Sequence, residues 1–389
     1  MFVGGRYLTA PPAALGALSI GERDLRPSYV KVALQSEQDI LNHAEIQNPS
    51  HLLTGHLDWA FAVEVLLPLF LLALSYDMLS AEREAGTLAQ VLAQGVSLGR
   101  LLTIRVTLRL ALGLLCTLPP ALIAVAVAHG VGSRREAAID FMLTGFAVAT
   151  YSLFWLLVAV AVNLFRRSGA FNATILFGVW LTIVLLAPAA IDLGSAMVYP
   201  LPSRVAQIQQ QRHAADAATA QGAAALQQYL QDHPDLVPTS GAMSDFYAST
   251  LVVRQESESA TRSTVDQFAS QRDSRERAMS RLRYLSPALS MRFALEDLAR
   301  SSDAHYRDFV RQTQLSLQRW REFFVPLIMR QQHLTPDDYD AIPTFVYQAE
   351  AATTVRQRVL SSLAALVAAA IIFILCVPFL VGRYKPVRG

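Results

Sequence analysis

The sequence is poor in charged residues, in lysine and in cysteine. Charged side chains make up 16% of its 389 residues, whereas soluble domains contain about 25%. Only Lys31 and Lys385 are lysines, and neither lies in a G-x-x-x-x-G-K-[ST] sequence. The chain therefore lacks the phosphate-binding loop whose lysine contacts nucleotide phosphates. The two cysteines, Cys116 and Cys376, fall inside apolar runs, which argues against a disulfide scaffold or a cysteine-based metal site.

Signatures of common catalytic and metal sites are also absent from the sequence. It contains no H-E-x-x-H and no G-x-S-x-G, and its eight histidines show no metal-ligand spacing. The net charge of +2 provides no strong field to attract nucleic acid. We therefore expect no catalytic residue, metal site or cofactor in this chain, and no nucleic-acid partner.

Four uncharged runs are long enough to cross a membrane as helices, which takes about 20 mostly apolar residues. They are residues 110–129, 141–165, 168–191 and 359–382. A fifth run, 59–76, is shorter and contains one acidic residue. These runs predict an all-α polytopic membrane protein with five visible transmembrane helices.

Charge divides the chain into regions. Residues 196–358 carry 36 charged side chains in 163 positions, whereas residues 59–195 carry 15 in 137. The more charged region is typical of a domain in water, and we predict that it is mostly helical, with long polar helices over 203–232 and 243–283. Within it, a stripe at about one helical turn is typical of the domain's own core: Phe309, Thr313, Leu317 and Trp320.

Basic residues in the short loops predict the orientation. Loops 77–103 and 163–169 and the tail hold seven of them, against two in loop 130–140, so we place the first three in the cytoplasm. Five spans then put the N-terminus outside, and we hypothesise a sixth helix upstream of Met1. The predicted parts are an extracytoplasmic segment 1–58, a four-helix membrane domain 59–195, a helical extracytoplasmic domain 196–358, a last transmembrane helix 359–382 and a cytoplasmic tail 383–389.

A short charged stretch follows the first apolar run. It comprises Glu82, Arg83, Glu84, Gly86, Thr87, Leu88, Val91 and Leu92. Glycine permits a bend, and we predict Thr87 as the N-cap of a new helix, whose apolar residues lie at i, i+3 and i+4. A short amphipathic helix beside acidic groups suits docking of a soluble partner. The alternative is a solvated loop with an interfacial helix.

Glu64 lies inside the first apolar run, with Pro68 one turn later. Acidic residues in a membrane usually face a cavity or a partner. We expect Glu64 to lie near the outer interface and reach water. The alternative places Glu64 and Pro68 on a translocation path, together with Pro119 and Pro120, which we expect to kink the second span.

Arg105 and Arg109 are four residues apart, so they share one helical face just before the second uncharged run. We expect both side chains to extend toward the cytoplasmic lipid head groups rather than to bind a substrate.

Several stretches resemble a known family. The sequence EREAGTL at 82–88, followed by LLTIRVTLRLAL at 101–112, resembles the ABC-2 class of ABC-transporter permeases. Residues 284–312 and 7–29 resemble the branch of that class with a large domain before the last helix, the DUF3526 type. In that branch a first helix precedes the stretch similar to 7–29, and this sequence lacks it.

The resemblance implies the permease subunit of an ATP-driven exporter in the bacterial cytoplasmic (inner) membrane. ATP and Mg would bind a separate ABC ATPase subunit, and loop 77–103 would couple that subunit to the lipid-embedded helices. A second permease copy or homologue would complete a dimer. One rival is a non-transporting membrane sensor or assembly factor that binds a partner through the extracytoplasmic domain. Another, an ion-coupled transporter, would place several ionisable groups at mid-membrane, where only Glu64 is a candidate.

Overall fold

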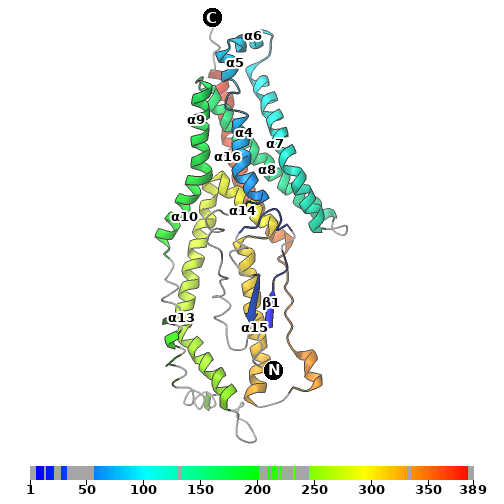
Figure 1. The fold of residues 1–389 in the computed structure, drawn as a ribbon, viewed down its shortest axis with the longest axis vertical. Helices are drawn as coiled ribbons and strands as arrows, with labels where there is room; N and C mark the ends of the chain where they lie inside the picture. Colours follow the sequence, from blue (N-terminus) through cyan, green and yellow to red (C-terminus); the bar gives the residue numbers. More distant parts are fainter. Residues whose placement is uncertain are drawn as a thin grey trace.

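The computed structural model confirms the predicted all-α polytopic fold (Figure 1). It describes residues 6–12, 15–21, 28–32, 57–129, 134–200, 245–330 and 334–383, together with short stretches at 209–210, 212–214, 216–217, 220 and 231–232. Most of the polar helix predicted over 203–232, and the tail beyond Arg383, lie outside the described residues.

Four long helices form the membrane part. At 30 to 32 residues each, they are about 45–48 Å long, which exceeds the roughly 30 Å of bilayer hydrocarbon. They are α7 (Leu98–His129), α8 (Arg134–Leu164), α16 (Ala352–Arg383) and a composite helix of α9 (Gly169–Trp180), the π-helix η3 (Leu181–Leu186) and α10 (Ala187–Val198). Helix α8 lies at the centre, and its Tyr151 and Trp155 are fully buried.

The fifth apolar run forms a shorter helix of three parts: α3 (Trp59–Phe61), the π-helix η2 (Ala62–Leu66) and α4 (Leu67–Ala73). We call these residues together the short helix. At about 22 Å it does not cross 30 Å of hydrocarbon by itself. Asp58 begins it, because its carboxylate accepts hydrogen bonds from the backbone N–H of Phe61 at 2.7 Å and of Ile20 at 2.8 Å.

Two small helices follow the short helix and lead into α7. These are α5 (Ser80–Glu84) and α6 (Thr87–Ala93), which lie at the same end of the molecule as the C-terminus (Figure 1). We call this the α5–α6 end. We call residues 199–351, the region between α10 and α16, the insert. Much of its described part lies in the lower half of Figure 1, together with β1.

The insert contains long helices joined by short turns. Helix α13 (Asp245–Leu282) confirms the helix predicted over 243–283. The 3-10 turn η5 (Arg283–Leu285), α14 (Pro287–Ala299), α15 (Asp303–Met329) and η6 (Pro336–Ala341) follow. Pro287 begins α14, where a missing N–H costs nothing, whereas Pro326 lies inside α15.

The predicted stripe on α15 packs inside the insert, as expected. Phe309, Thr313 and Leu317 are buried, and Phe309 and Leu317 share a core with Leu8 and Val30. The latter two come from antiparallel strands that the sequence analysis did not predict, β1 (Arg6–Thr9) and β2 (Tyr29–Val32), in which Leu8 pairs with Val30. The two strands and α15 therefore pack around one core.

One helix of the insert belongs to the core of the membrane part. Helix α14 crosses the molecule below the short helix (Figure 1). Its buried residues Met291 and Leu295 join one apolar cluster with Trp155 of α8 and Leu363 of α16. The insert is thus joined to the membrane helices by an apolar contact as well as by the covalent continuity of the backbone.

This core predicts a difference between two leucine substitutions on spanning helices. Leu156→Ala, at a fully buried position on α8, should lower the free energy of unfolding by about 2–5 kcal/mol because it leaves a cavity. Leu115→Ala, at a position on α7 that is 69% exposed, should change it by less than about 1 kcal/mol. Thermal unfolding of the two purified variants in one detergent tests this, and equal losses would contradict the described core.

Candidate functional site

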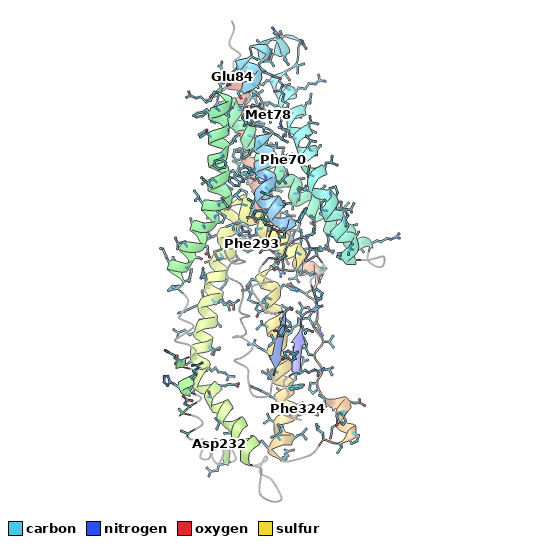
Figure 2. The ribbon with its side chains drawn as sticks, in the orientation of Figure 1. Phe70, Met78, Glu84, Asp232, Phe293 and Phe324 are labelled. Carbon is cyan, nitrogen blue, oxygen red and sulfur yellow. The ribbon has the colours of Figure 1, made fainter. Side chains whose placement is uncertain are left out.

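The first candidate site is the stretch between the short helix and α6, at the α5–α6 end (Figure 2). After Ala73 the backbone turns, and side chains from α7, α8 and α9 bind its free polar groups. Asn163 of α8 donates to the carbonyl of Ser75 at 3.0 Å and accepts from the N–H of Leu79 at 3.1 Å. Asn172 of α9 donates to the carbonyl of Tyr76 at 3.2 Å and to Asn163 at 3.3 Å.

Two arginines of α7 bind the same turn from the other side. Arg109 donates to the carbonyl of Leu74 at 2.8 Å, and Arg105 donates to the carbonyl of Met78 and to the carboxylate of Glu82. The expectation that both arginines extend toward lipid head groups was therefore wrong. In this partly buried site, backbone carbonyls and a carboxylate satisfy the guanidinium groups better than an extended conformation would.

The acidic and basic residues of α5 attach it to the loop before α9. Glu84 accepts a hydrogen bond from the N–H of Gly169 at 2.9 Å, so its negative charge lies at the N-terminus of α9, where the helix dipole favours an anion. Arg83 donates to the carbonyl of Arg167. Helix α5 is thus fixed both to α7 and to the α8–α9 loop.

Helix α6 begins differently from the prediction. Gly86, not Thr87, occupies the N-cap position, with a left-handed φ of 70° that glycine adopts without strain. Thr87 is the first helical residue, and its hydroxyl donates to the carbonyl of Glu82 at 3.2 Å. The apolar stripe is as predicted: Leu88 is buried, and Leu92 packs against the same cluster as Leu79. Val91 is half-buried.

The outward face of α5 and α6 is exposed and has no large apolar side chain among its residues. Its residues are small or polar: Ala81, Glu84, Ala85, Gly86, Thr87, Ala89, Gln90 and Ala93. A surface of small side chains on firmly attached helices lets another protein approach closely with little loss of side-chain entropy. This face is therefore suited to docking rather than to chemistry.

The second candidate site is an ion pair between the short helix and α14. Arg292 donates to both carboxylate oxygens of Glu64, at 2.8 and 2.9 Å. Glu64 is 4% exposed, so the expectation that it reaches water was wrong. A two-pronged arginine pair is the geometry in which a carboxylate remains charged in an apolar core.

Prolines and π-helices free backbone carbonyls around this pair, and side chains satisfy them. Pro68 has no N–H to offer the carbonyl of Glu64 four residues earlier, and the Tyr151 hydroxyl donates to that carbonyl at 2.9 Å. Likewise Pro188 follows η3, and the hydroxyl of Ser286, the N-cap of α14, donates to the carbonyl of Ile183 at 3.2 Å. Helix α14 therefore contacts both π-helices.

Helix α14 is also bound to α16. Asp297 accepts from Arg358 at 3.2 Å, and just before α14 the buried Arg283 donates to Ser361 at 3.1 Å. These polar contacts lie at the end of α16 nearer the insert, so they fix α14 at that level.

A further polar cluster joins the helices at the insert end. Arg356 of α16 contacts Glu136 and Asp140 of α8, and His129 of α7 lies 3.2 Å from Asp140. Pro119 and Pro120 lie in α7, which continues as a helix through both. In the ranges that the structure describes, no three histidine, cysteine, aspartate or glutamate residues are grouped so as to hold a metal ion.

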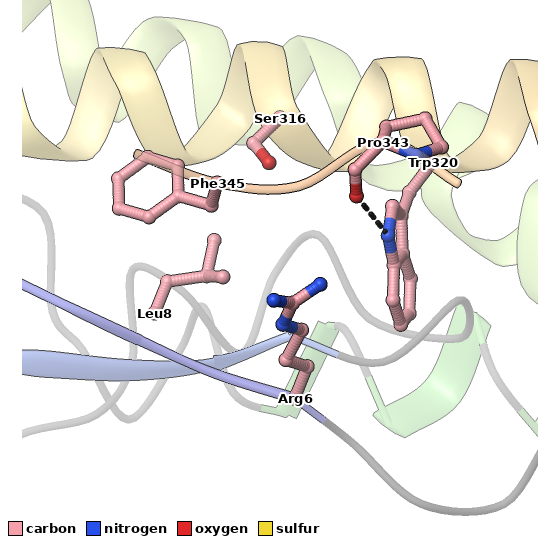
Figure 3. Close-up of a pocket in the computed structure, with 6 residues that line it drawn as sticks. All are labelled: Arg6, Leu8, Ser316, Trp320, Pro343 and Phe345. Atoms are coloured by element: carbon pink, nitrogen blue, oxygen red, sulfur yellow. Dashed lines mark hydrogen bonds between the residues drawn. The ribbon is translucent and has the colours of Figure 1, made fainter. Parts of the chain in front are cut away.

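A pocket in the insert is too small for a substrate. It lies between β1, α15 and the segment before α16, and is lined by Arg6, Leu8, Ser316, Trp320, Pro343 and Phe345 (Figure 3). Its volume of about 10 Å³ accommodates about one water molecule. The Trp320 indole donates to the carbonyl of Pro343 at 3.0 Å along one wall. This pocket is a packing gap.

Helix number, length and hydropathy define the molecule as a multi-pass helical membrane protein. Residues 204–348 match a family model described as "Domain of unknown function (DUF3526)", which confirms the predicted resemblance for the insert. The matched range contains α13, α14 and α15, and hence Arg292. Comparison with curated proteins and with solved structures gave no match.

The sequence analysis missed three residues that organise these sites. Asn163 and Asn172 interrupt apolar runs, and an amide in such a run usually has a buried partner. The two asparagines could therefore have been predicted from the sequence as buried residues with hydrogen-bond partners. For Arg292 the sequence offered no clue, because its partner lies 228 positions away.

The first site predicts the effect of removing one amide. Asn163→Ala should leave the N–H of Leu79 buried without its partner, at about 1–3 kcal/mol, and should remove one of the two hydrogen bonds to the carbonyl of Ser75, which also accepts from the N–H of Met78. Backbone amides of residues 75–84 should then exchange hydrogen faster, as measured by mass spectrometry. Thr174→Ala, which removes an exposed hydroxyl from α9, is the control. Unchanged exchange in Asn163→Ala would show that the turn does not depend on the amide.

The ion pair predicts that removing either partner destabilises the protein by a different amount, because the Arg292 side chain is 44% exposed and the Glu64 side chain is 5% exposed. Arg292→Met leaves a buried carboxylate and should lower the free energy of unfolding by about 3 kcal/mol. Glu64→Met leaves an arginine whose partly exposed side chain can extend away from the apolar cluster, and it should cost about 1 kcal/mol. The double variant should be more stable than Arg292→Met alone. Thermal unfolding ranks the three, and the reverse order of the single variants would contradict the burial of Glu64.

Proposed function

We propose that this chain is the permease subunit of an ABC-2-type exporter, working in the bacterial inner membrane with a separate ATPase subunit that binds ATP and Mg. Three observations support the proposal. The insert matches the DUF3526 model, four helices are long and apolar enough to span a membrane, and α5 and α6 present an exposed face at one end of them.

The attachment of α5 is the observation that carries the proposal. A segment that receives force from a partner must be fixed to the helices that it moves. Glu82 contacts Arg105 of α7, and Glu84 caps the N-terminus of α9. Glu82 is thus half-buried against α7, whereas Glu84 is exposed on the outward face and reaches the N-terminus of α9, and the small residues between and after them face outward. In this proposal Glu82 and Glu84 transmit force, and the face around Ala89 receives the ATPase.

The remaining predicted partners follow from the same proposal. Two ATPase subunits would act with two permease copies, either identical or homologous, surrounded by membrane lipid. Glu64, Pro68, Pro119 and Pro120 stay candidates for lining the translocation path. In the described conformation Glu64 is bound to α14, so a path along it would require α14 to move.

The sensor or assembly-factor alternative draws on one specific observation. Helix α14 links the insert to the membrane core, and such a link would also carry a signal from the insert inward. The two functions differ in what binds the α5–α6 face. An exporter requires an ATPase there, whereas a sensor does not.

Co-purification with a candidate ABC ATPase subunit, co-expressed with this chain, tests the proposal. Ala89→Arg places a long charged side chain on the exposed face of α6 and should abolish ATPase binding without unfolding the permease. The matched control is Ala260→Arg, at an exposed position on α13 of the insert, which should bind the ATPase normally. Binding that is equal in both variants would exclude this face as the docking site.

A second pair of substitutions separates docking from force transmission. Glu82→Ala/Glu84→Ala removes two attachments of α5, leaves that of Arg83 to the carbonyl of Arg167, and should give an assembled complex in which ATP hydrolysis no longer drives export, or a complex that assembles poorly. Rates of hydrolysis and of substrate export, measured in proteoliposomes, report on this. Unchanged assembly, hydrolysis and export would overturn the coupling role.

A further inference from the structure

Polar contacts hold the short helix at Glu64, in its N-terminal half, and just beyond its C-terminal end. At the α5–α6 end, the carbonyl of Leu74 binds Arg109 and the adjoining turn binds Asn163. Ten residues earlier, Glu64 binds Arg292 of the insert. At 1.5 Å per residue these contacts lie about 15 Å apart along one helix. The α5–α6 end is thus connected to α14 by one short element.

The body of the short helix is firmly packed between those contacts. Leu67 and Leu71 are buried. Gly113 of α7 approaches so closely that a Cβ atom there would lie 3.2 Å from the Leu71 side chain. Small residues permit such close contact between membrane helices. The α4 part of the short helix is therefore closely packed against α7.

The element that it meets at its other end, α14, contacts two places where regular helical bonding is interrupted. These are η2 of the short helix, through Arg292, and η3, through Ser286. π-helical turns inside α-helices are frequent at functional sites. Ile183 lies 14 residues into its helix, about 21 Å from the α5–α6 end. Helix α14 therefore contacts this spanning helix near its midpoint.

We propose that Glu64 and Arg292 are a positioning pair that makes the short helix and α14 move together, so that a displacement of the α5–α6 segment reaches the insert. The source of that displacement rests on the proposed function, whereas the link itself does not. The ion pair suits this role because it is directional and two-pronged, and because its carboxylate has no access to water as a substitute partner.

A static brace would use the same contacts, so the test measures transmission rather than stability. The full chain is placed in lipid nanodiscs, and hydrogen exchange is followed over the amides of α14. Arg105→Met removes the contacts of Arg105 with Glu82 and Met78 at the far end of the short helix. The substitution is made in the wild-type chain and in the Glu64→Met/Arg292→Met background. The matched control is Arg100→Met, an exposed arginine of the same helix.

Transmission through the pair predicts that Arg105→Met speeds exchange in α14 by about five-fold or more in the wild-type chain. In the double-methionine background the same substitution should change exchange by less than about two-fold, and Arg100→Met should change it in neither. An equal acceleration in both backgrounds, or none in either, would overturn the proposal.

A failure of the proposed role of the ion pair can be distinguished from a failure of the proposed function. This experiment contains no ATPase, so it decides on the link even where no ATPase co-purifies. With an ATPase bound, ATP should change exchange in α14 of the wild-type chain and leave α14 of the double-methionine variant unchanged. ATP-dependent changes of equal size in both would also overturn the role of the pair.

Discussion

The ion pair between Glu64 and Arg292 is the interaction on which the arrangement of this protein depends. A carboxylate that is 4% exposed inside a cluster of apolar side chains is strongly unfavourable without a partner. The chain supplies that partner from the insert, on α14. Because Glu64 belongs to the short helix, the requirement to pair its charge brings α14 into the membrane part. The insert is therefore bound to the membrane helices at a fixed depth and orientation.

The need to pair backbone carbonyls also binds the insert to the membrane helices. In a membrane every backbone polar group must find a partner inside the protein, and the prolines and π-helices of the short helix and of α9–α10 leave carbonyls without their usual donors. Tyr151, Trp180 and Ser286 donate to the carbonyls of Glu64, Val65 and Ile183. One of these donors again comes from the insert. Irregular backbone is thus tolerated where α8, α9 and α14 surround it, and those are the places where the helices have most freedom to rearrange.

The sequence alone predicted what depends on local pattern. Long uncharged runs identified the spanning helices, a long polar stretch identified α13, and an apolar stripe at one-turn spacing identified the buried face of α15. The charged stretch after the short helix was also predicted to form a short amphipathic helix. Prediction failed where the partner is distant in sequence. Glu64 was expected to reach water, and Arg105 and Arg109 to reach lipid, because a run of residues does not reveal which buried carboxylate or carbonyl will face a given side chain. The two short strands were missed for the same reason, since each is stabilised by α15 rather than by its own pattern.

The central claim is that α14 belongs to the membrane part although it lies in the insert. Spin labels on cysteines introduced in a chain without Cys116 and Cys376 test it directly. Leu285, an exposed residue just before α14, and Ala260, an exposed residue of α13, serve as label sites. In lipid bilayers, the label at 285 should collide with oxygen, which concentrates in the hydrocarbon, and be protected from a water-soluble nickel chelate, while the label at 260 should show the opposite. Equal access of the nickel chelate to both labels would contradict the account, because the whole insert would then lie in water.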